Sequence, residues 1–348
     1  MLRMLSVPFS IFFGCVLGGV TVIGIVGNLF VIIAILGDRK MRKSAMNLLL
    51  LNLAIADLLY VATFVHAWLP ILLYGNGGWI LPNVWCAPTR YLSNVFIITS
   101  MLTYMAICIE RLRYIAIIHP MKAARFCSRN NILCIVLGIW LFNLVFQAPY
   151  LALYIAVPIP GETAISLCHN TQGNHTYWLT FKWVEMVVSF VVPCLVSVVL
   201  YTIICRELWS TSSLLNKAQN SIVSHKNGKS KEKNPVTETL AARRSVVKML
   251  ITCVVLFYVC YIPMESFFVY GFFWHARLPI PHEGLLVITS MVCGISAFNP
   301  FLYTLFSKTF RARVRQIIVS CCGCRKTSHT IRPSQRSITR TTSSFGRI

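Results

Sequence analysis

Seven long apolar runs constrain this 348-residue chain more than any other feature. Each run is long enough to cross a hydrocarbon core of about 30 Å as a helix. In lipid, every backbone N–H and C=O needs a partner inside the protein, so runs of this length form helices that pack against one another. The sequence therefore predicts an all-α membrane protein, a seven-transmembrane helix bundle with spans near 10–36, 46–73, 86–109, 131–156, 183–205, 246–273 and 284–306.

The basic residues are distributed unevenly between the two ends of these runs. The chain carries 32 Lys and Arg against 10 Asp and Glu, a formal net charge of +22. Of the 32, 28 lie in four segments, 37–46, 111–130, 206–248 and 307–348. The positive-inside rule then places the N-terminus outside the cell and the C-terminus in the cytoplasm. Basic loops beside an anionic leaflet account for the charge, so we expect membrane lipids as partners and no nucleic acid.

The sequence also predicts which segments lie outside the helix bundle. The run nearest the N-terminus is too long for a cleavable signal peptide, and its positive charges follow it. Amphipathic spacing predicts a short helix on the inner surface, and polar, basic composition predicts a flexible inner loop and a disordered tail. The predicted parts are a short extracellular N-terminus at 1–9, the bundle at 10–306 with outer loop 157–180 and inner loop 207–240, the amphipathic helix at 307–320 and the cytoplasmic tail at 321–348.

Most of the 14 cysteines sit singly in apolar runs, where a free Cys behaves as a small hydrophobe. Two lie at the outer ends of the runs or in the loop beside them: Cys86 opens the third run and Cys168 lies in the outer loop. Both face the oxidising side, so we predict a disulfide between them. Asn174, in the same loop, begins the sequence Asn-His-Thr and is a predicted glycosylation site. Three cysteines after the amphipathic segment are predicted palmitoylation sites, since a zinc site there lacks ligands: Cys321, Cys322 and Cys324.

Polar motifs inside the runs point to a family. They are Gly27-Asn28, Leu53-Ala-Ile-Ala-Asp57-Leu58, Trp79 seven residues before Cys86, Glu110-Arg111-Leu112, Trp140, Pro193 with Tyr201, Phe257-Tyr-Val-Cys260-Tyr261-Ile-Pro263 and Asn299-Pro300-Phe-Leu-Tyr303. In this order they resemble the rhodopsin-like (class A) G-protein-coupled receptors over about residues 10–320. The resemblance implies a plasma-membrane receptor, not an enzyme, that activates heterotrimeric G proteins and is regulated by receptor kinases and arrestin.

The resemblance also implies roles for residues within the bundle. Those assigned to activation and G-protein coupling are Glu110, Arg111, Tyr201, Phe257, Tyr261, Pro263, Pro300 and Tyr303. An Arg that simply snorkels from a helix end is the alternative for Arg111. Tyr261 replaces the family's usual Trp, Leu112 its common aromatic, and Arg243 and Arg244 stand where some relatives carry an acid, so we expect no salt bridge from Arg111 to that spot.

Asp57 lies at mid-membrane depth, where a lone carboxylate is expensive and needs a partner, a cation or a proton. Its expected polar neighbours are Asn28, Ser100, Ser296 and Asn299. This grouping predicts a sodium or proton site. A purely structural hydrogen-bond node is the alternative.

The outer half of the bundle restricts the class of ligand. The seventh run contains no Lys for a retinal Schiff base, and Ser93 stands where amine receptors place an Asp. What remains is polar and charged. Four residues share one face of the third run by their i, i+3, i+4, i+7 spacing: Arg90, Ser93, Asn94 and Ile97. The other residues expected at the ligand are Glu185, Glu265, Trp68, Tyr150 and Phe268.

Two acids suit a ligand cation and Arg90 suits a carboxylate or carbonyl, and peptides offer both. An internal pair between Arg90 and a Glu is the alternative. Segments 118–127 and 244–250 resemble the thyrotropin-releasing-hormone, ghrelin, neuromedin U and ecdysis-triggering-hormone receptor group, which implies a neuropeptide agonist and the G protein Gq. Two alternative functions are considered. One is a class A receptor for a lipid or other small molecule, which the charged pocket disfavours. The other is a transporter, which the lack of repeated halves disfavours.

Overall fold

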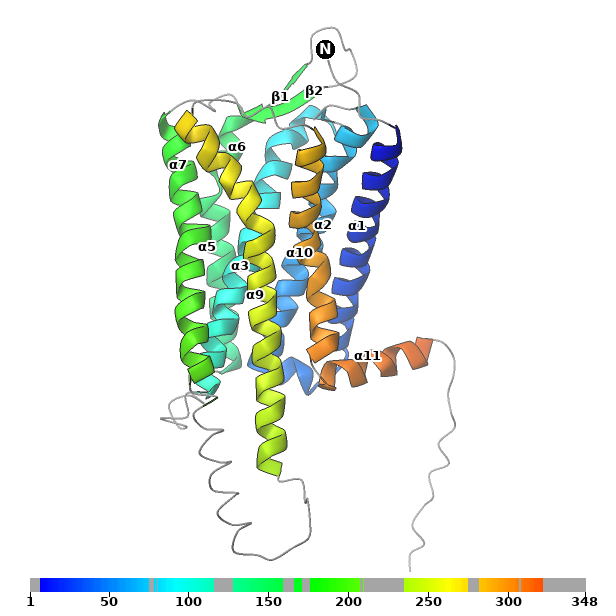
Figure 1. Cartoon of the computed structure of the whole chain (residues 1–348), viewed down its shortest axis with the longest axis vertical. Helices are drawn as coiled ribbons and strands as arrows, with labels where there is room; N and C mark the ends of the chain where they lie inside the picture. Colours follow the sequence, from blue (N-terminus) through cyan, green and yellow to red (C-terminus); the bar gives the residue numbers. More distant parts are fainter. Residues whose placement is uncertain are drawn as a thin grey trace, which may run out of the picture.

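Seven long helices lie side by side in a single bundle (Figure 1). The computed structural model describes residues 7–74, 78–79, 81–115, 128–158, 166–170, 176–206, 209, 235–274, 282–306 and 308–321. Within these ranges, seven helices are long and apolar enough to cross a membrane. The predicted fold class, a seven-helix transmembrane bundle with a short helix after it, is confirmed.

The helices follow the apolar runs, with differences mainly at their ends. In chain order they are α1 Val7–Leu36, η1 Met41–Lys43, α2 Ala45–Tyr74, η2 Asn83–Trp85, α3 Cys86–Ile115, α5 Arg129–Phe146, α6 Pro149–Leu153, α7 Thr176–Met186 continued by the π-helical turn η3 Val187–Val191 and by helical residues 192–206, α9 Pro235–Trp274, α10 His282–Phe306 and α11 Lys308–Cys321.

The fourth span is shorter than its apolar run predicted. Ser128 caps α5, its Oγ accepting a hydrogen bond from the Asn131 backbone N–H at 3.3 Å. The helix ends at Phe146, and Pro149 then opens the short helix α6. Proline has no N–H to donate to the carbonyl one turn earlier, and at a first helical position that N–H would have no partner, so Pro149 suits the start of a new helix. Residues 154–156, predicted as helix, lie instead in the strand β1 Tyr154–Pro158.

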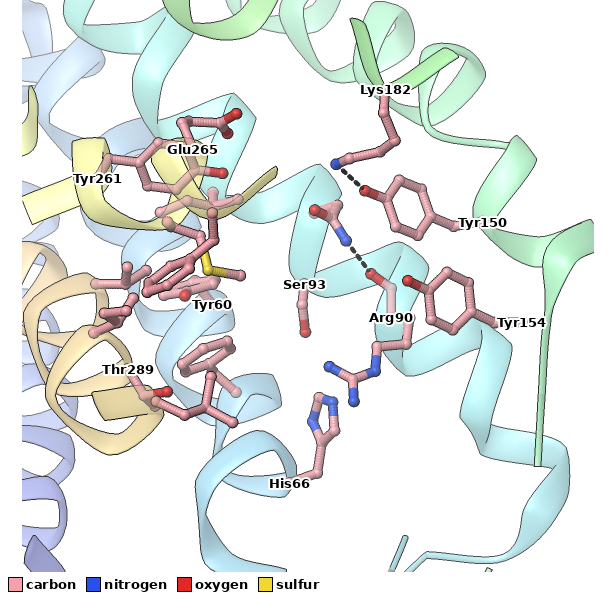
Figure 2. A pocket seen from close by; sticks show the side chains of 18 of the residues that line it. Tyr60, His66, Arg90, Ser93, Tyr150, Tyr154, Lys182, Tyr261, Glu265 and Thr289 are labelled. Atoms are coloured by element: carbon pink, nitrogen blue, oxygen red, sulfur yellow. Dashed lines mark hydrogen bonds between the residues drawn. The ribbon is translucent and has the colours of Figure 1, made fainter. Parts of the chain in front are cut away.

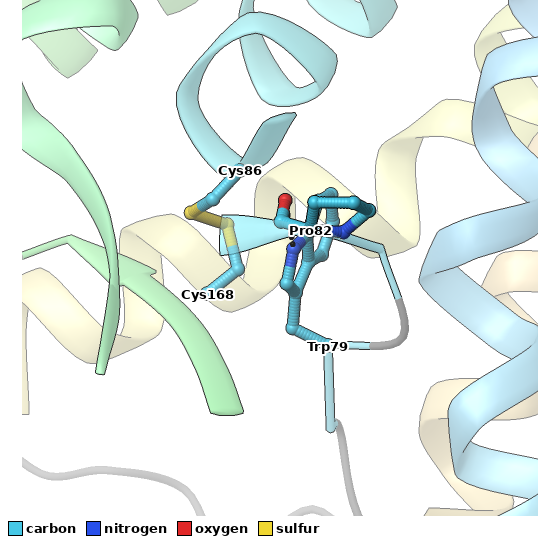
Figure 3. The surroundings of a disulfide bond; sticks show 4 residues. All are labelled: Trp79, Pro82, Cys86 and Cys168. Atoms are coloured by element: carbon cyan, nitrogen blue, oxygen red, sulfur yellow. Dashed lines mark hydrogen bonds between the residues drawn. A yellow bond between two sulfur atoms is a disulfide. The ribbon is translucent and has the colours of Figure 1, made fainter. Parts of the chain in front are cut away.

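A β-hairpin covers one end of the bundle, which we call the hairpin end. β1 pairs antiparallel with β2 Ser166–Asn170, and Ala156 lies opposite Cys168. Cys168 forms a disulfide with Cys86 at the start of α3, with 5.5 Å between their Cα atoms (Figure 3). The predicted disulfide is confirmed, and it fixes the hairpin to the central helix. Beside it, the Trp79 indole N–H donates to the Pro82 carbonyl at 3.2 Å.

The sixth span extends well beyond its apolar run at the end opposite the hairpin (Figure 1). α9 begins at Pro235, inside the segment 207–240 that the sequence assigned to a flexible loop. Proline is well suited to a first helical position, because the N–H it lacks would have no partner there. The residues that follow, Leu240, Ala241 and Ala242 among them, have high helix propensity. The prediction from polarity therefore placed the start of this span, residue 246, too far along the chain.

α11 packs against the bundle at the same end. The Arg313 guanidinium donates from Nη2 to the Gly37 carbonyl at 2.8 Å, which fastens the helix to the end of α1. The Phe310 ring meets the Tyr303 ring of α10 edge-on, with centroids 6.2 Å apart. The predicted amphipathic helix is therefore present, and its apolar face has a partner in the bundle.

Candidate ligand-binding cavity

A cavity of about 490 Å³ opens at the hairpin end between α2, α3, α6, α7, α9, α10 and β1 (Figure 2). Six of the residues that the sequence assigned to the ligand line it: Arg90, Ser93, Asn94, Ile97, Tyr150 and Glu265. Those that complete the wall are Tyr60, Phe64, His66, Tyr154, Trp178, Lys182, Tyr261, Met264, Phe267, Leu285, Ile288, Thr289 and Val292.

Three of the predicted ligand residues are not among the described residues that line the cavity: Trp68, Phe268 and Glu185. Trp68 does not line the cavity, which corrects the prediction: it packs with Phe13, Leu17 and Leu286 in a separate cluster between α1, α2 and α10. The period of a helix alone did not show that this side of α2 faces α1 rather than the pocket. Phe268 belongs to α9, but its side chain is outside the described residues.

Glu185 is buried behind the cavity wall and has a cationic partner from its own helix. Its Oε2 forms a salt bridge with the Lys182 ammonium. The Tyr150 hydroxyl donates to the same carboxylate, 3.1 and 3.2 Å from its two oxygens, and accepts from Lys182 Nζ at 3.0 Å. The predicted partner of Glu185 was a cation of the ligand. The i, i+3 spacing of Lys182 and Glu185, which places them on one helical face, is the sequence signal for the internal pair.

Arg90 and Glu265 lie apart on different walls of the cavity. Figure 2 shows the Arg90 guanidinium directed toward His66, with Tyr154 beside the Arg90 side chain, while Glu265 projects from α9 beside Tyr261. Among the described residues neither group takes part in an ion pair, so the internal Arg90–Glu265 pair considered above is not formed. The Arg90 carbonyl accepts from Asn94 Nδ2 at 2.8 Å, which is a contact within α3. The cavity thus offers one cation and one anion that have no ion-pair partner among the described residues.

His66 is a wall residue that the sequence analysis did not select. Its side chain is only 6% exposed, and its ring meets the Trp79 ring edge-on with centroids 5.2 Å apart. Its Nδ1 contacts the Thr63 carbonyl one turn earlier in α2. A lone His in an apolar run carries little signal of its own. Only the packing of α2 against α3 brings it beside Arg90.

Below the cavity, Asp57 is fully buried and holds three side chains together. Ser100 Oγ and Ser296 Oγ donate to its Oδ1 at 2.8 and 3.1 Å, and Asn299 Nδ2 donates to its Oδ2 at 2.5 Å. Asn28 joins through the backbone, because its amide donates to the Ser296 carbonyl at 2.9 Å rather than to the carboxylate. The predicted neighbours of Asp57 therefore do gather around it, from α1, α3 and α10.

Aromatic rings connect the cavity to this polar group. Tyr261 lines the cavity and stacks on Phe257, with centroids 5.5 Å apart. The centroid of the Phe257 ring in turn lies 6.1 Å from that of the Tyr104 ring, and the Tyr104 hydroxyl hydrogen-bonds the Asn299 side chain. Contacts thus run continuously from the cavity floor to Asp57.

A second buried amide, Asn52, bridges Thr103 and Trp140 at 2.8 Å each.

The remaining predicted residues lie toward the α11 end or beyond the described chain. Glu110, Tyr201 and Tyr303 are buried there. Arg111 lies on α3 next to Glu110, but its side chain is outside the described residues, as are Asn174, Cys322 and Cys324 altogether. Pro263 and Pro300 lie within α9 and α10, and Cys321 is the last residue of α11.

Comparisons with known proteins give this architecture a family. The profile described as "7 transmembrane receptor (rhodopsin family)" matches residues 27–303. Neuropeptide receptor 15 of Caenorhabditis elegans is 38% identical over 324 residues, which cover 90% of this chain and 92% of that receptor.

Two further relatives are more distant. The tachykinin-like peptides receptor 86C of Drosophila melanogaster is 27% identical over 310 residues, covering 86% of this chain and 57% of that receptor. The thyrotropin-releasing hormone receptor of Bos taurus is 29% identical over 317 residues, covering 87% and 76%. The resemblance drawn from the motifs is confirmed, and with it the expectation of a receptor rather than an enzyme. The chain belongs to the rhodopsin family of seven-transmembrane receptors.

Proposed function

We propose that this receptor binds a peptide agonist in the cavity at the hairpin end and activates a heterotrimeric G protein at the opposite end. The observation that carries the proposal is the pair of unneutralised charges, Arg90 and Glu265, on different walls of one cavity of about 490 Å³. A partly buried charge is stabilised only by an opposite charge or by good hydrogen bonds. A peptide supplies a cation and a carbonyl or carboxylate on one molecule, whereas a lipid that carries no cationic group would leave Glu265 without a partner. The relatives described above, a neuropeptide receptor, a tachykinin-like peptides receptor and a thyrotropin-releasing hormone receptor, support this choice.

Glu265 is the acid we assign to the ligand cation. Glu185 already has Lys182 and Tyr150 as partners, so a ligand would have to displace an existing salt bridge to reach it. Lys182 holds that carboxylate and lines the cavity at the same time. We therefore assign Glu185, Lys182 and Tyr150 to shaping the wall.

Agonist binding would be transmitted through the rings below the cavity. Tyr261 touches both the cavity and Phe257, so a ligand that moves Tyr261 also acts on the middle of α9. Pro263 removes one backbone hydrogen bond from that helix and allows it to bend. The change is a population shift, driven by the higher affinity of the agonist for one of two states. The cleft that opens at the other end would be lined by Arg111, Tyr201 and Tyr303.

Asp57 and its neighbours form the polar group that this shift would rearrange. Their carboxylate and hydroxyl oxygens are the donors that hard cations prefer. Within the described residues no group of three or more His, Cys, Asp and Glu could hold a metal ion, so any cation here would rely on one carboxylate, hydroxyls and water. We propose a sodium site, with the hydrogen-bond node as the alternative.

The proposal includes an orientation and a set of regulators. The hairpin end would face outward, with Asn174 glycosylated, and the basic segments would face the cytoplasm. Cys321, Cys322 and Cys324 would carry palmitate beside α11. Hydroxyl groups of the tail, at Thr341, Thr342, Ser343 and Ser344, would be phosphorylated by receptor kinases and then bind arrestin. Gq is the G protein that the subgroup resemblance favours.

A screen of synthetic peptides against transfected cells tests the proposal, with calcium release and guanine-nucleotide exchange on added G protein as the two readouts. For any active peptide, Glu265→Gln should lower potency by about ten- to several-hundred-fold, because a charge-assisted hydrogen bond contributes roughly 1.5–3 kcal/mol. Replacing the Arg or amine of that peptide by a neutral group should cause a similar loss, and the two losses should not add.

Glu283→Gln is the matched control, since Glu283 lies in the first turn of α10 and does not line the cavity. It should leave potency unchanged. Fully additive losses, or an unchanged potency in Glu265→Gln, would refute the contact. Activation by lipids alone would favour the small-molecule alternative, and failure to promote nucleotide exchange with any ligand would favour a transporter.

A further inference from the structure

The hydrogen bonding of His66 fixes which of its ring nitrogens can receive a ligand. Its Nδ1 contacts the Thr63 carbonyl, which can only accept a hydrogen bond, so Nδ1 carries the proton. In the neutral imidazole Nε2 is then a bare acceptor. Nε2 is buried, makes no hydrogen bond, and belongs to a side chain that is 6% exposed on the cavity wall. A buried acceptor of this kind requires a donor.

Arg90 supplies the opposite requirement at the same place. Its guanidinium is a donor only, its buried Nε makes no hydrogen bond, and Figure 2 shows the His66 ring directed at it from α2. The wall therefore presents a donor and an acceptor side by side. A ligand group that satisfies both must present an acceptor and an N–H along one edge.

The geometry of amides distinguishes the groups that could do this. In a trans peptide bond the C=O and the N–H point in opposite directions, so one peptide group cannot reach both residues. A carboxylate would bind Arg90 well but would turn an oxygen lone pair toward the Nε2 lone pair. A primary carboxamide has one N–H on the same side as its C=O, the arrangement by which Asn and Gln side chains bind the paired donor and acceptor of adenine.

We propose that Arg90 and His66 together bind a primary carboxamide of the peptide agonist, Arg90 donating to its oxygen and His66 Nε2 accepting from its nitrogen. The inference rests on the proposed function, since it names the chemistry that the cavity selects. Two sources carry this group: an amidated peptide C-terminus, and the side chain of Asn or Gln. Glu265, on another wall, remains the contact for a cationic group of the same peptide.

Affinity selection on the purified full-length receptor in lipid nanodiscs tests the inference without a known ligand. The probes are three equimolar libraries of synthetic heptapeptides with one fixed Arg: C-terminal amides without Asn or Gln, the same sequences as free acids, and free acids with one Asn or Gln. Wild type should enrich the amides over the matched acids, because the acid loses the hydrogen bond to Nε2 and turns a lone pair toward it, which offsets its charged contact with Arg90. Comparable enrichment of the third library would identify the side-chain source.

Variants and ligand analogues make the comparison specific. His66→Phe keeps a ring against Trp79 but has no acceptor, and should bring the amide-to-acid ratio close to one. His66→Gln, whose terminal amide reaches the place of Nε2, should keep part of the preference. Thr63→Val is the matched control, because it changes only a hydroxyl that bonds the Leu59 and Tyr60 carbonyls and leaves the Thr63 carbonyl in place. Should His66→Phe fail to fold, N,N-dimethylamides of the enriched peptides should bind wild type about tenfold more weakly than the primary amides.

Three outcomes would each overturn the carboxamide site and leave the peptide receptor intact. They are wild-type enrichment of the plain acids equal to that of both carboxamide-containing libraries, a carboxamide preference that survives His66→Phe, and full binding of the dimethylamides. Enrichment of no peptide from any library would overturn the proposed function along with it.

Discussion

Lys182→Met is the substitution that most directly tests how the cavity wall is held. It leaves the Glu185 carboxylate, 7% exposed, with the single proton of the Tyr150 hydroxyl as its donor. Removing one partner of a buried ion pair costs about 3–5 kcal/mol. We expect about 3 kcal/mol here, at the lower limit, because the Lys182 side chain is 22% exposed and water can reach the vacated position.

Glu185→Gln should cost less. The Lys182 ammonium keeps its contact with the Tyr150 hydroxyl at 3.0 Å and keeps its access to solvent, so we expect about 1–2 kcal/mol. The double variant removes both charges and leaves an amide that can still pair with Tyr150. It should therefore be more stable than Lys182→Met alone, with a coupling of about 1–2 kcal/mol.

Thermal unfolding of the purified receptor in one detergent, followed by tryptophan fluorescence, measures these differences as relative melting temperatures. The amount of each variant at the cell surface provides an independent ranking of their stabilities. A double variant as unstable as the sum of the two single variants would refute the coupling. An unchanged melting temperature in Lys182→Met would show that the salt bridge does not stabilise the wall.

Two further predictions concern the helices around Asp57. In Gly27→Ala the new Cβ would lie 2.9 Å from Cγ of the Pro300 ring, which cannot rotate away. We therefore expect about 1–3 kcal/mol of destabilisation in the same melting assay. Gly18→Ala is the control on the same helix, because its new Cβ would have no neighbour within 4 Å and should not destabilise the receptor. A melting temperature for Gly27→Ala equal to that of Gly18→Ala would contradict the close packing of α1 on α10. If sodium at Asp57 stabilises the inactive state, Asp57→Asn should abolish the effect of sodium on agonist affinity, because coupling between two sites is reciprocal. An undiminished sodium response in radioligand competition would leave the structural hydrogen-bond node as the remaining explanation.

The sequence by itself determined the class of fold, because hydrophobicity and span length are local properties that lipid makes decisive. It also determined the disulfide, since Cys86 and Cys168 were the two cysteines on the oxidising side. The family motifs in the sequence predicted which polar residues lie near Asp57. Helix ends were less predictable. Composition began the sixth span at residue 246, whereas α9 begins at Pro235, and it carried the fourth span past Pro149. The backbone at a helix end responds to proline and capping as well as to polarity.

Only the tertiary structure decided which charges are neutralised and which are left for a ligand. The sequence treated Glu185 and Glu265 alike, as two acids in one cavity. The packing of α6 against α7 gives Glu185 the Tyr150 hydroxyl in addition to Lys182, and leaves Glu265 without an ion pair among the described residues. Likewise, nothing local predicted that His66 would lie beside Arg90, because the two belong to different helices. Pairing between helices depends on how the helices rotate and pack, which a pattern read along one helix does not contain.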